Sequence, residues 1–521
     1  MDAQEEPETS PTKVKLVRAD AIEYDNSLAK AQRIIGNVLF EHNGAKMYCD
    51  SAWLYEEKNA LEAWGDIRIR DEDGLSIQGD ELDYDGDSLL AELRGERVIL
   101  RDQSMTLNTQ YVQYHTEDRL ASYYGGGRII NSKNRNVLTS EAGTYFAASK
   151  IFHFKDSVIL ENPKYTIYTD TLHYHDYNGQ AFFFGPTDIL SEENSIYCEN
   201  GWYDTMKERA RFGENAELWN KDQRLTGDSI YYDRNLGRGE AFGSVVILDT
   251  LNQIQISGEY GKHLEEAGES LVTEQALIEQ FFDTDTLSLH ADTLLMSADT
   301  LEMKRILAYR GVRIYKPDLQ GSCDSLVYAE ADSLIRMYQE PFVWSEENQI
   351  NGEFIDLYTF DGSIQRIYTE SMAFIISQVD SVHYNQIKGR TLNGLFIDDE
   401  LRTVLIEGNG ECIYYALEEE EEPTDSLLTE EPPKIIGVNK AECSRMRIKV
   451  MDNEIQQVSF LTEPDNAFYP LKDISESELI LKDFQWKGSE RPLSKDDLFT
   501  TGETSSSVSE FLEETEGYQN D

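Results

Sequence analysis

The chain has 521 residues, of which 40% are hydrophobic, so it is long enough to bury a sizeable core. Its 98 Asp and Glu side chains outnumber 47 Lys and Arg and give a formal net charge of −51. This balance argues against a nucleic-acid partner, because phosphate contacts need clustered Lys and Arg, and it disfavours docking on anionic lipid head groups. No apolar run approaches the length of a membrane span.

The chain begins with a polar, proline-containing stretch, and we expect residues 1–13 to form a flexible lead. The start at Met1 lacks the basic and apolar stretches of a signal peptide. The sequence therefore leaves two readings open, a cytosolic protein or a sequence that begins near the processed end of an exported one.

A repeat of roughly 30 residues begins at about Val14 and carries two markers. The first is a small residue and an aspartate ahead of a hydrophobic-x-aromatic alternation, and the second is a glycine ahead of a β-branched run. The aspartates are Asp20, Asp50, Asp80, Asp170, Asp228, Asp292 and Asp324, and the glycines include Gly36, Gly65, Gly95 and Gly126. A fixed period of this length predicts a repeat architecture in which each unit buries its apolar face against its neighbours.

Each repeat is predicted to contain two short strands, because apolar residues alternate with period two as in Ile254-Gln255-Ile256-Ser257. Turn residues separate the strands at Asp73-Gly74, Asn178-Gly179 and Asp361-Gly362. A propeller blade needs more strands and a longer repeat. The pattern favours an elongated antiparallel all-β structure in which two sheets stack unit after unit.

The array is predicted to cover residues 14–415, although its rhythm weakens between Glu259 and Leu287. Residues 416–434 contain five consecutive glutamates and are expected to be a disordered acidic insertion. Alternation returns afterwards, so residues 435–500 are expected to continue the β-structure. Residues 501–521, rich in Ser and Glu, are expected to be a disordered tail.

The sequence shows no catalytic, metal or cofactor site. An aspartate that recurs in every repeat is expected to accept structural hydrogen bonds beside a turn rather than to act as an acid or base. His173 and His175 fall on one face of a strand without a third ligand nearby, which favours exposed strand residues over a metal site. The five cysteines form no C-x-x-C pair and are interpreted as small strand residues.

Six apolar residues alternate at equivalent positions of successive repeats and would line the inside as one stripe. They are Val38, Phe40, Ile67, Ile69, Val98 and Leu100. For any one of them a packed core is the simpler interpretation. The functional interpretation is an open groove that holds acyl chains.

The recurring Ala-Asp-x-Ile-x-Tyr-Asp and Gly-x-x-Val-x-Leu segments resemble the OstA-like (organic solvent tolerance) family, which includes LptA-type bridge proteins and the N-terminal domain of LptD. The resemblance is clearest over residues 14–250 and weaker to about residue 415. The segment Tyr384–Gly389, with Phe484-Gln485-Trp486 and Arg491-Pro492, resembles the long OstA-like proteins of Bacteroidetes-type bacteria.

The resemblance implies an open β-jellyroll, V-shaped in section, that is not an enzyme and needs no cofactor. It implies a periplasmic location, with outer-membrane association left open, and binding of lipopolysaccharide or a similar glycolipid through acyl chains. Partners would be other Lpt-type bridge components, joined by edge-strand addition. The strong negative charge of the chain would repel the phosphate groups of a phosphorylated lipid. Divalent cations that bridge the two, or an arrangement in which the charge lies only on the outer face, would remove this conflict.

Two other functions compete with transport. A structural or adhesive β-solenoid with a closed core would bind no apolar ligand. A carbohydrate-active enzyme would show one repeat that breaks the pattern with an acid pair, and the sequence shows none.

Overall fold

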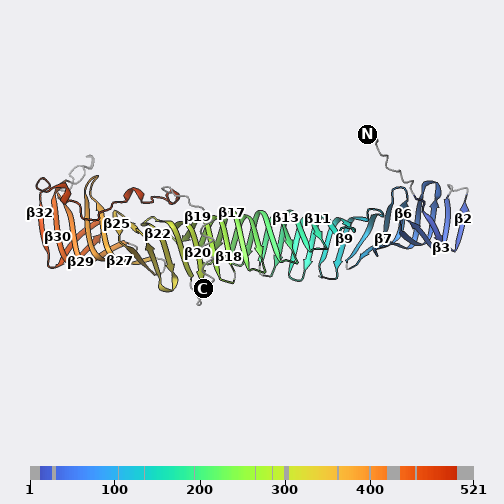
Figure 1. Cartoon of the computed structure of the whole chain (residues 1–521), viewed down its shortest axis with the longest axis horizontal. Coiled ribbons are helices and arrows are strands. Elements are labelled where there is room, and N and C mark those ends of the chain that lie inside the picture. Colours follow the sequence, from blue (N-terminus) through green and yellow to red (C-terminus); the bar gives the residue numbers. More distant parts are fainter. Residues whose placement is uncertain are drawn as a thin grey trace, which may run out of the picture. The chain divides into compact units, whose positions relative to one another are not determined.

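The computed structural model describes residues 12–500, except for 26–30, 104, 134, 193, 265, 284, 299–303, 361–362, 398–399, 419–433 and 452–453. The described residues form 32 β-strands and six short 3-10 turns, and they divide into two compact units, Met1–Phe242 and Gly243–Asp521 (Figure 1). The all-β jellyroll of repeat-built antiparallel strands expected from the sequence is confirmed. Most of the lead, most of the acidic insertion and the whole tail lie outside the described residues.

In unit 1, strands β3 to β16 follow one another in space as they do in sequence, each pairing antiparallel with the next. Two shorter strands, β1 and β2, both pair with β3. The strands are β1 (Lys15–Arg18), β2 (Ala21–Asp25), β3 (Ala31–His42), β4 (Ala45–Tyr55), β5 (Ala60–Arg70), β6 (Ser76–Asp85), β7 (Leu90–Asp102), β8 (Met105–His115), β9 (Leu120–Asn131), β10 (Val137–Phe146), β11 (Ile151–Asn162), β12 (Tyr165–His175), β13 (Gln180–Ser191), β14 (Asn194–Asp204), β15 (Arg209–Asn220) and β16 (Gln223–Asp233). A 3-10 turn, η1 (Glu56–Lys58), lies between β4 and β5.

Each of these long strands bends near its middle, because the pairing register shifts there in one strand pair after another. In β3 the shift falls between Ile35 and Val38, where Gly36 and Asn37 have φ of 78° and 46°. Glycine and asparagine tolerate this left-handed conformation. The bend divides every strand into two halves whose apolar sides face one common interior.

The repeated aspartates lie at this bend and not beside a turn, which corrects the position expected from the sequence. Asp50 packs against Gly65 of the neighbouring strand, where an added Cβ would lie 2.5 Å from the Asp50 Oδ2 atom. Asn37 donates from Nδ2 to the Asp20 carboxylate at 2.8 Å. In these repeats the aspartate of one strand therefore packs against the glycine segment of a neighbouring strand.

A second aspartate, which follows the tyrosine of the repeat, closes the turn after it. Asp85 Oδ1 accepts the backbone N–H of Asp87 at 2.9 Å, and Asp204 Oδ1 accepts that of Lys207 at 2.9 Å. Asp233 Oδ1 likewise accepts the backbone N–H of Asn235, two residues further along the chain. These short side-chain bonds satisfy turn amides that the sheet cannot reach.

Strand β17 (Arg238–Asp249) spans the boundary between the two units, and unit 2 continues the two-strand repeat. Its strands are β18 (Ile254–Leu264), β19 (Glu269–Phe281), β20 (Thr286–Ala298), β21 (Lys304–Lys316), β22 (Leu319–Ala329), β23 (Leu334–Tyr338), β24 (Phe342–Ser345), β25 (Asn348–Asn351), β26 (Phe354–Phe360), β27 (Ser363–Gln378), β28 (Tyr384–Ile397), β29 (Glu400–Leu417), β30 (Ile435–Met451), β31 (Glu454–Thr462) and β32 (Asp465–Tyr469). Strands β18 to β20 pair antiparallel with a register shift near the middle of each pair, as in unit 1, so the weakened sequence rhythm there does not interrupt the array.

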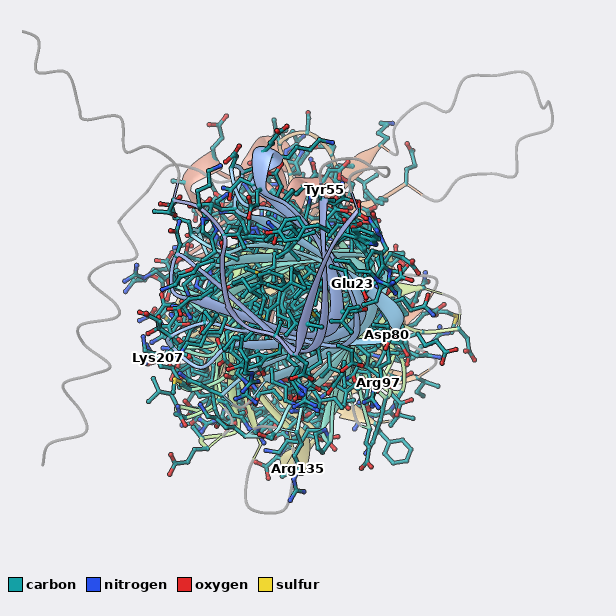
Figure 2. All side chains as sticks on the ribbon, turned by 90° about the vertical axis from the view of Figure 1, so that its right-hand side faces the viewer. Glu23, Tyr55, Asp80, Arg97, Arg135 and Lys207 are labelled. Carbon is teal, nitrogen blue, oxygen red and sulfur yellow. The ribbon has the colours of Figure 1, made fainter. Side chains whose placement is uncertain are left out.

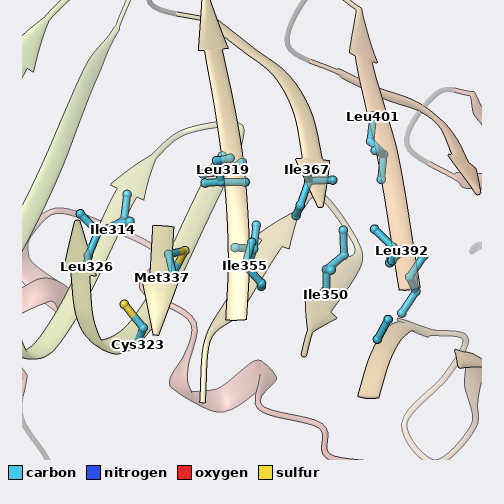
Figure 3. Close-up of a cluster of buried hydrophobic side chains, with 14 of the residues drawn as sticks. Ile314, Leu319, Cys323, Leu326, Met337, Ile350, Ile355, Ile367, Leu392 and Leu401 are labelled. Carbon is cyan, nitrogen blue, oxygen red and sulfur yellow. The ribbon is translucent and has the colours of Figure 1, made fainter. Parts of the chain in front are cut away.

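Two successive long strand positions of unit 2 are each split in two. Strands β23 and β24 both pair with β22, and β25 and β26 both pair with β27. Gln339 and Glu340 have positive φ at the first break, and Pro341, which has no N–H to donate, follows them. Short 3-10 turn η2 (Glu330–Asp332) precedes the split. Side chains such as Met337, Ile350 and Ile367 still meet in one buried cluster (Figure 3).

After β32 the chain runs back across the strands of unit 2 as a C-terminal arm, residues 470–500 (Figure 1). The arm contains η3 (Leu471–Asp473), η4 (Glu476–Glu478), η5 (Gly488–Glu490) and η6 (Asp496–Phe499) and no strand, although β-structure was expected up to residue 500. Lys495 Nζ reaches Glu279 of β19 at 2.5 Å, and the Phe484 ring lies against Tyr384 of β28.

Buried glutamines hold the arm by its backbone. Gln349 donates to the Gln485 carbonyl at 2.6 Å and accepts the Lys487 N–H at 2.7 Å. Gln386 donates to the Leu479 carbonyl and accepts the Leu481 N–H, at 2.8 Å for each bond. A primary amide side chain has the same kinds of donor and acceptor as a peptide group, so each glutamine pairs with the backbone of the arm as a neighbouring strand would.

Candidate functional site: an apolar interior

One continuous row of apolar side chains runs through 14 successive strands of unit 1, from β3 to β16. Each member is the direct cross-strand partner of the next, and we call the row the apolar ladder. Its members are Phe40, Met47, Ile69, Ile77, Leu100, Leu107, Ile129, Leu138, Leu160, Ile167, Ile189, Ile196, Leu218 and Leu225. Such a row arises because every strand keeps the same register relative to its bend.

The six residues predicted to line a groove all lie on this inner face. Three of them, Phe40, Ile69 and Leu100, belong to the apolar ladder itself. Val38, Ile67 and Val98 precede them by two residues and lie beside the bend. All six are 0–1% exposed, so this part of the interior is packed shut, and their contact with lipid stays a prediction.

The ladder members on the even-numbered strands, such as Met47, Ile77 and Leu107, were not predicted from the sequence. The sequence pattern around them is weaker, because they precede the aspartate marker and no glycine marker lies just before them. The alternation in Ser76-Ile77-Gln78 would have located one of them.

A second row lies on the other half of the same strands, and we call it the tyrosine row. It alternates aromatic residues with alanine, so that most large rings face a small neighbour across the strand pair. Phe152 is the exception, because it lies between two tyrosines and stacks on Tyr145. Its members are Tyr84, Ala91, Tyr114, Ala121, Tyr145, Phe152, Tyr174, Ala181, Tyr203, Ala210 and Tyr232. The tyrosines are those of the sequence repeat, and they point inward near the strand ends.

Three of these tyrosines reach across the interior to the opposite strand ends. The Tyr145 hydroxyl donates to Asp102 Oδ2 at 2.5 Å, and the Tyr84 hydroxyl lies 2.7 Å from His42 Nδ1. The Tyr114 hydroxyl lies 3.4 Å from Asp71 Oδ2. Burial raises the pKa of Tyr145, and the hydrogen bond to the Asp102 carboxylate raises it further, so the hydroxyl stays a donor at every physiological pH.

Further polar contacts join the same two sets of strand ends. Arg119 Nε donates to Asp71 Oδ2 at 3.0 Å, and Asn131 Nδ2 donates to Asp176 Oδ1 at 2.8 Å. A small apolar cavity lies beneath the latter contact. Together with the tyrosine contacts these bonds form a row, which we call the seam, that closes the interior along β3 to β12.

Exposure of both rows increases toward the end of unit 1. Ladder members from Phe40 to Ile167 are at most 7% exposed, whereas the last four, from Ile189 to Leu225, are half-buried. The tyrosines of the tyrosine row change in the same direction, from buried Tyr114 to half-buried Tyr203, while Ala181 and Ala210 stay buried. We call strands β13–β16 the half-open section, because there the ladder positions are partly accessible to solvent, while Phe183, Phe212 and Ile230 of the same inner face stay buried.

The inner face of the half-open section is apolar and carries small residues at the bend. Thr187, Cys198, Ala216 and Gly227 occupy successive bend positions. These positions, the ladder positions and the tyrosine row carry no charged side chain in this section. The arrangement offers apolar contact and no reactive group.

No other part of the described chain offers a stronger site. Among described residues, no group of three or more His, Cys, Asp or Glu side chains is placed to hold a metal ion. His173 stacks on His153 with ring centroids 3.7 Å apart on the outer face. The five cysteines are free and buried. Within the described ranges, no helix has the length and apolarity that a membrane span requires.

Comparison with known proteins identifies the first part of the array. Residues 11–170 and 165–228 match the family model described as OstA-like protein, so the expected resemblance is confirmed for this part of the chain. The solved structures include a similar one, LptH from Pseudomonas aeruginosa, described as the LptA homologous periplasmic component of the conserved lipopolysaccharide transport device. It is 16% identical, with 29% of this chain and 82% of that chain covered and a TM-score of 0.17. No curated protein matches the chain.

Proposed function

We propose that this chain, whose residues 11–228 match the OstA-like family, binds a lipopolysaccharide-like glycolipid in the periplasm and conducts it toward the outer membrane. The acyl chains would lie inside the jellyroll against the apolar ladder, and the protein would act by binding, without catalysis. The observation that carries the proposal is the unbroken run of apolar partners from Phe40 to Leu225.

Burial of the acyl chain supplies the affinity, at about 0.8 kcal/mol for each methylene removed from water. Adjacent ladder positions are separated by one strand spacing of about 4.8 Å. A bound chain therefore meets equivalent surroundings after each small step. Similar energies at successive positions allow the chain to slide without crossing a large barrier.

The acidic surface agrees with this arrangement, because few charged side chains of unit 1 are buried, and the buried Asp102, Asp204 and Asp233 lie at strand ends. In unit 1, Asp80, Arg97 and Lys207 all project from the outer side of the ribbon (Figure 2). The inner rows of the half-open section carry no charge. Repulsion between the acidic exterior and a phosphorylated head group would favour insertion of the acyl chains alone.

Partners would add strands to the exposed edge at the start of the array. Strands β1 and β2 pair only with β3 among the described strands. On β2, Ile22 is 48% and Tyr24 is 72% exposed. An apolar unpaired edge of this kind suits strand addition by another bridge component.

One observation favours a second function, a structural solenoid with a closed core. The six predicted groove residues are 0–1% exposed, and a permanently closed interior would bind no lipid. The two functions differ in what reaches the inner face of the half-open section.

Photo-crosslinking tests the difference with two adjacent residues of β15. A photoreactive residue at Leu218 faces the interior, and one at Trp219, which is 39% exposed, faces outward as the matched control. With purified full chain and lipopolysaccharide, we expect adducts at Leu218 and none at Trp219. Absence of adducts at Leu218, Ile196 and Ile189 in a folded protein would establish the closed solenoid.

A further inference from the structure

We propose that the half-open section, β13–β16, is the site at which acyl chains enter unit 1, and that the seam holds β3–β12 shut until a chain parts it. The inference rests on the proposed function and deepens it. The hydrogen bonds of the repeat tyrosines would keep the interior of β3–β12 closed while no acyl chain occupies it.

Equivalent positions in β7–β8 and in β14–β15 of unit 1 show the contrast. Leu100 and Leu218 belong to the same apolar ladder, but Leu100 is 0% exposed and Leu218 is half-buried. Tyr114 and Tyr203 occupy equivalent places in the tyrosine row, and Tyr114 is 0% exposed while Tyr203 is half-buried. The ladder and the tyrosines of the tyrosine row therefore become partly exposed in the same strands.

The chemistry of this section fits an acyl chain better than a peptide. Its backbone N–H and C=O groups pair with neighbouring strands along β13 to β16. An extended peptide inside would find few partners for its own polar groups, which is costly in an apolar site. An acyl chain needs none, and the bend residues Ala216 and Gly227 are small and carry no polar side chain that would oppose it.

The seam is suited to open and close because it is made of separate hydrogen bonds. Each bond removed should shift the balance between closed and open forms by about two- to tenfold. Tyr84, Tyr114 and Tyr145 contribute one contact each at intervals of about one repeat. Removal of all three hydroxyls should open β3–β12 while the rings still fill the interior.

The experiment compares photoreactive residues at Leu100 and at Leu218 in the full chain with lipopolysaccharide. In the wild type we expect at least tenfold more adduct at Leu218. In the triple variant Tyr84→Phe, Tyr114→Phe and Tyr145→Phe, the yield at Leu100 should rise to within a fewfold of that at Leu218. Tyr55→Phe serves as the matched control, since its hydroxyl contacts Glu62 on the outer face at 3.2 Å.

The outcomes separate this inference from the proposed function. Equal adduct at Leu100 and Leu218 in the wild type, or an unchanged ratio in a folded triple variant, overturns the inference and leaves glycolipid binding intact. No adduct at either position in any variant overturns both. Thermal unfolding of each variant establishes that it is folded.

Discussion

The carboxyl group of Asp80 fills the space in which a side chain on Gly95 would begin. A Cβ built on Gly95 would lie 2.9 Å from Asp80 Cγ, and the same carboxylate accepts the backbone N–H of Glu96 at 3.1 Å. The two residues lie on neighbouring strands β6 and β7. This contact explains why the sequence repeats an aspartate and a glycine together, with no need for catalysis.

Gly95→Ala should therefore destabilise the protein by about 1–3 kcal/mol, as overpacking does elsewhere. In an Asp80→Ala background the new methyl group has space, and the cost should fall by about 0.5–3 kcal/mol through coupling. Denaturant unfolding of the four proteins measures both effects. Gly239→Ala, where the nearest atom is 3.9 Å from the added Cβ, is the control, and additive effects at residues 80 and 95 would contradict the contact.

The arm should loosen when a glutamine that binds it is replaced. Gln349→Leu keeps the side chain apolar and of similar size, but it leaves the Gln485 carbonyl and the Lys487 N–H unpaired. Each unsatisfied group costs about 1–3 kcal/mol. We expect faster amide exchange and faster proteolysis across residues 479–491, with β27 still protected. Gln378→Leu, at an exposed position of β27, should leave the arm protected.

The cysteines should be unreactive in the folded protein. Burial raises the pKa of Cys198 to about 12, and burial together with the nearby Cys443 raises that of Cys412 to about 12. Because the thiolate is the reactive form, a maleimide at pH 8 should label neither residue before unfolding. Mass spectrometry after pulse labelling gives the result, and denatured protein, in which all five thiols react, is the control. Rapid labelling of Cys198 in the native state would show that its strand opens.

Stability should decrease on mild acidification because of the stacked histidines. Burial lowers the pKa of His153 and of His173. Repulsion from His175 lowers the pKa of His153 further, and repulsion from both His153 and His175 lowers that of His173. A lowered folded pKa means that the unfolded state binds more protons below its own pKa of about 6.5. The free energy of unfolding should therefore fall as the pH drops from 7 to 5. His173→Phe should show a shallower fall than the wild type in urea titrations at both ends of this range, and an identical slope would refute the assignment.

The sequence by itself determined the local features of the fold. The recurrence of Asp20, Asp50 and Asp80 established the period, and the alternation around them established the strands. Both follow from short-range physics, because a strand has period two and a left-handed bend selects glycine. The inward side of Phe40 and Ile69 was predictable for the same reason.

The tertiary structure decided how far the interior is open. Tyr84 and His42 are 42 residues apart, and no local pattern links a tyrosine to the strand end that it meets across the interior. Gln349 and Lys487 are 138 residues apart, so no local sequence pattern predicts the path of the arm either. Leu100 and Leu218 occupy equivalent places in the sequence repeat, yet only Leu218 is accessible. Exposure depends on contacts between distant strand ends, which a repeat period does not encode.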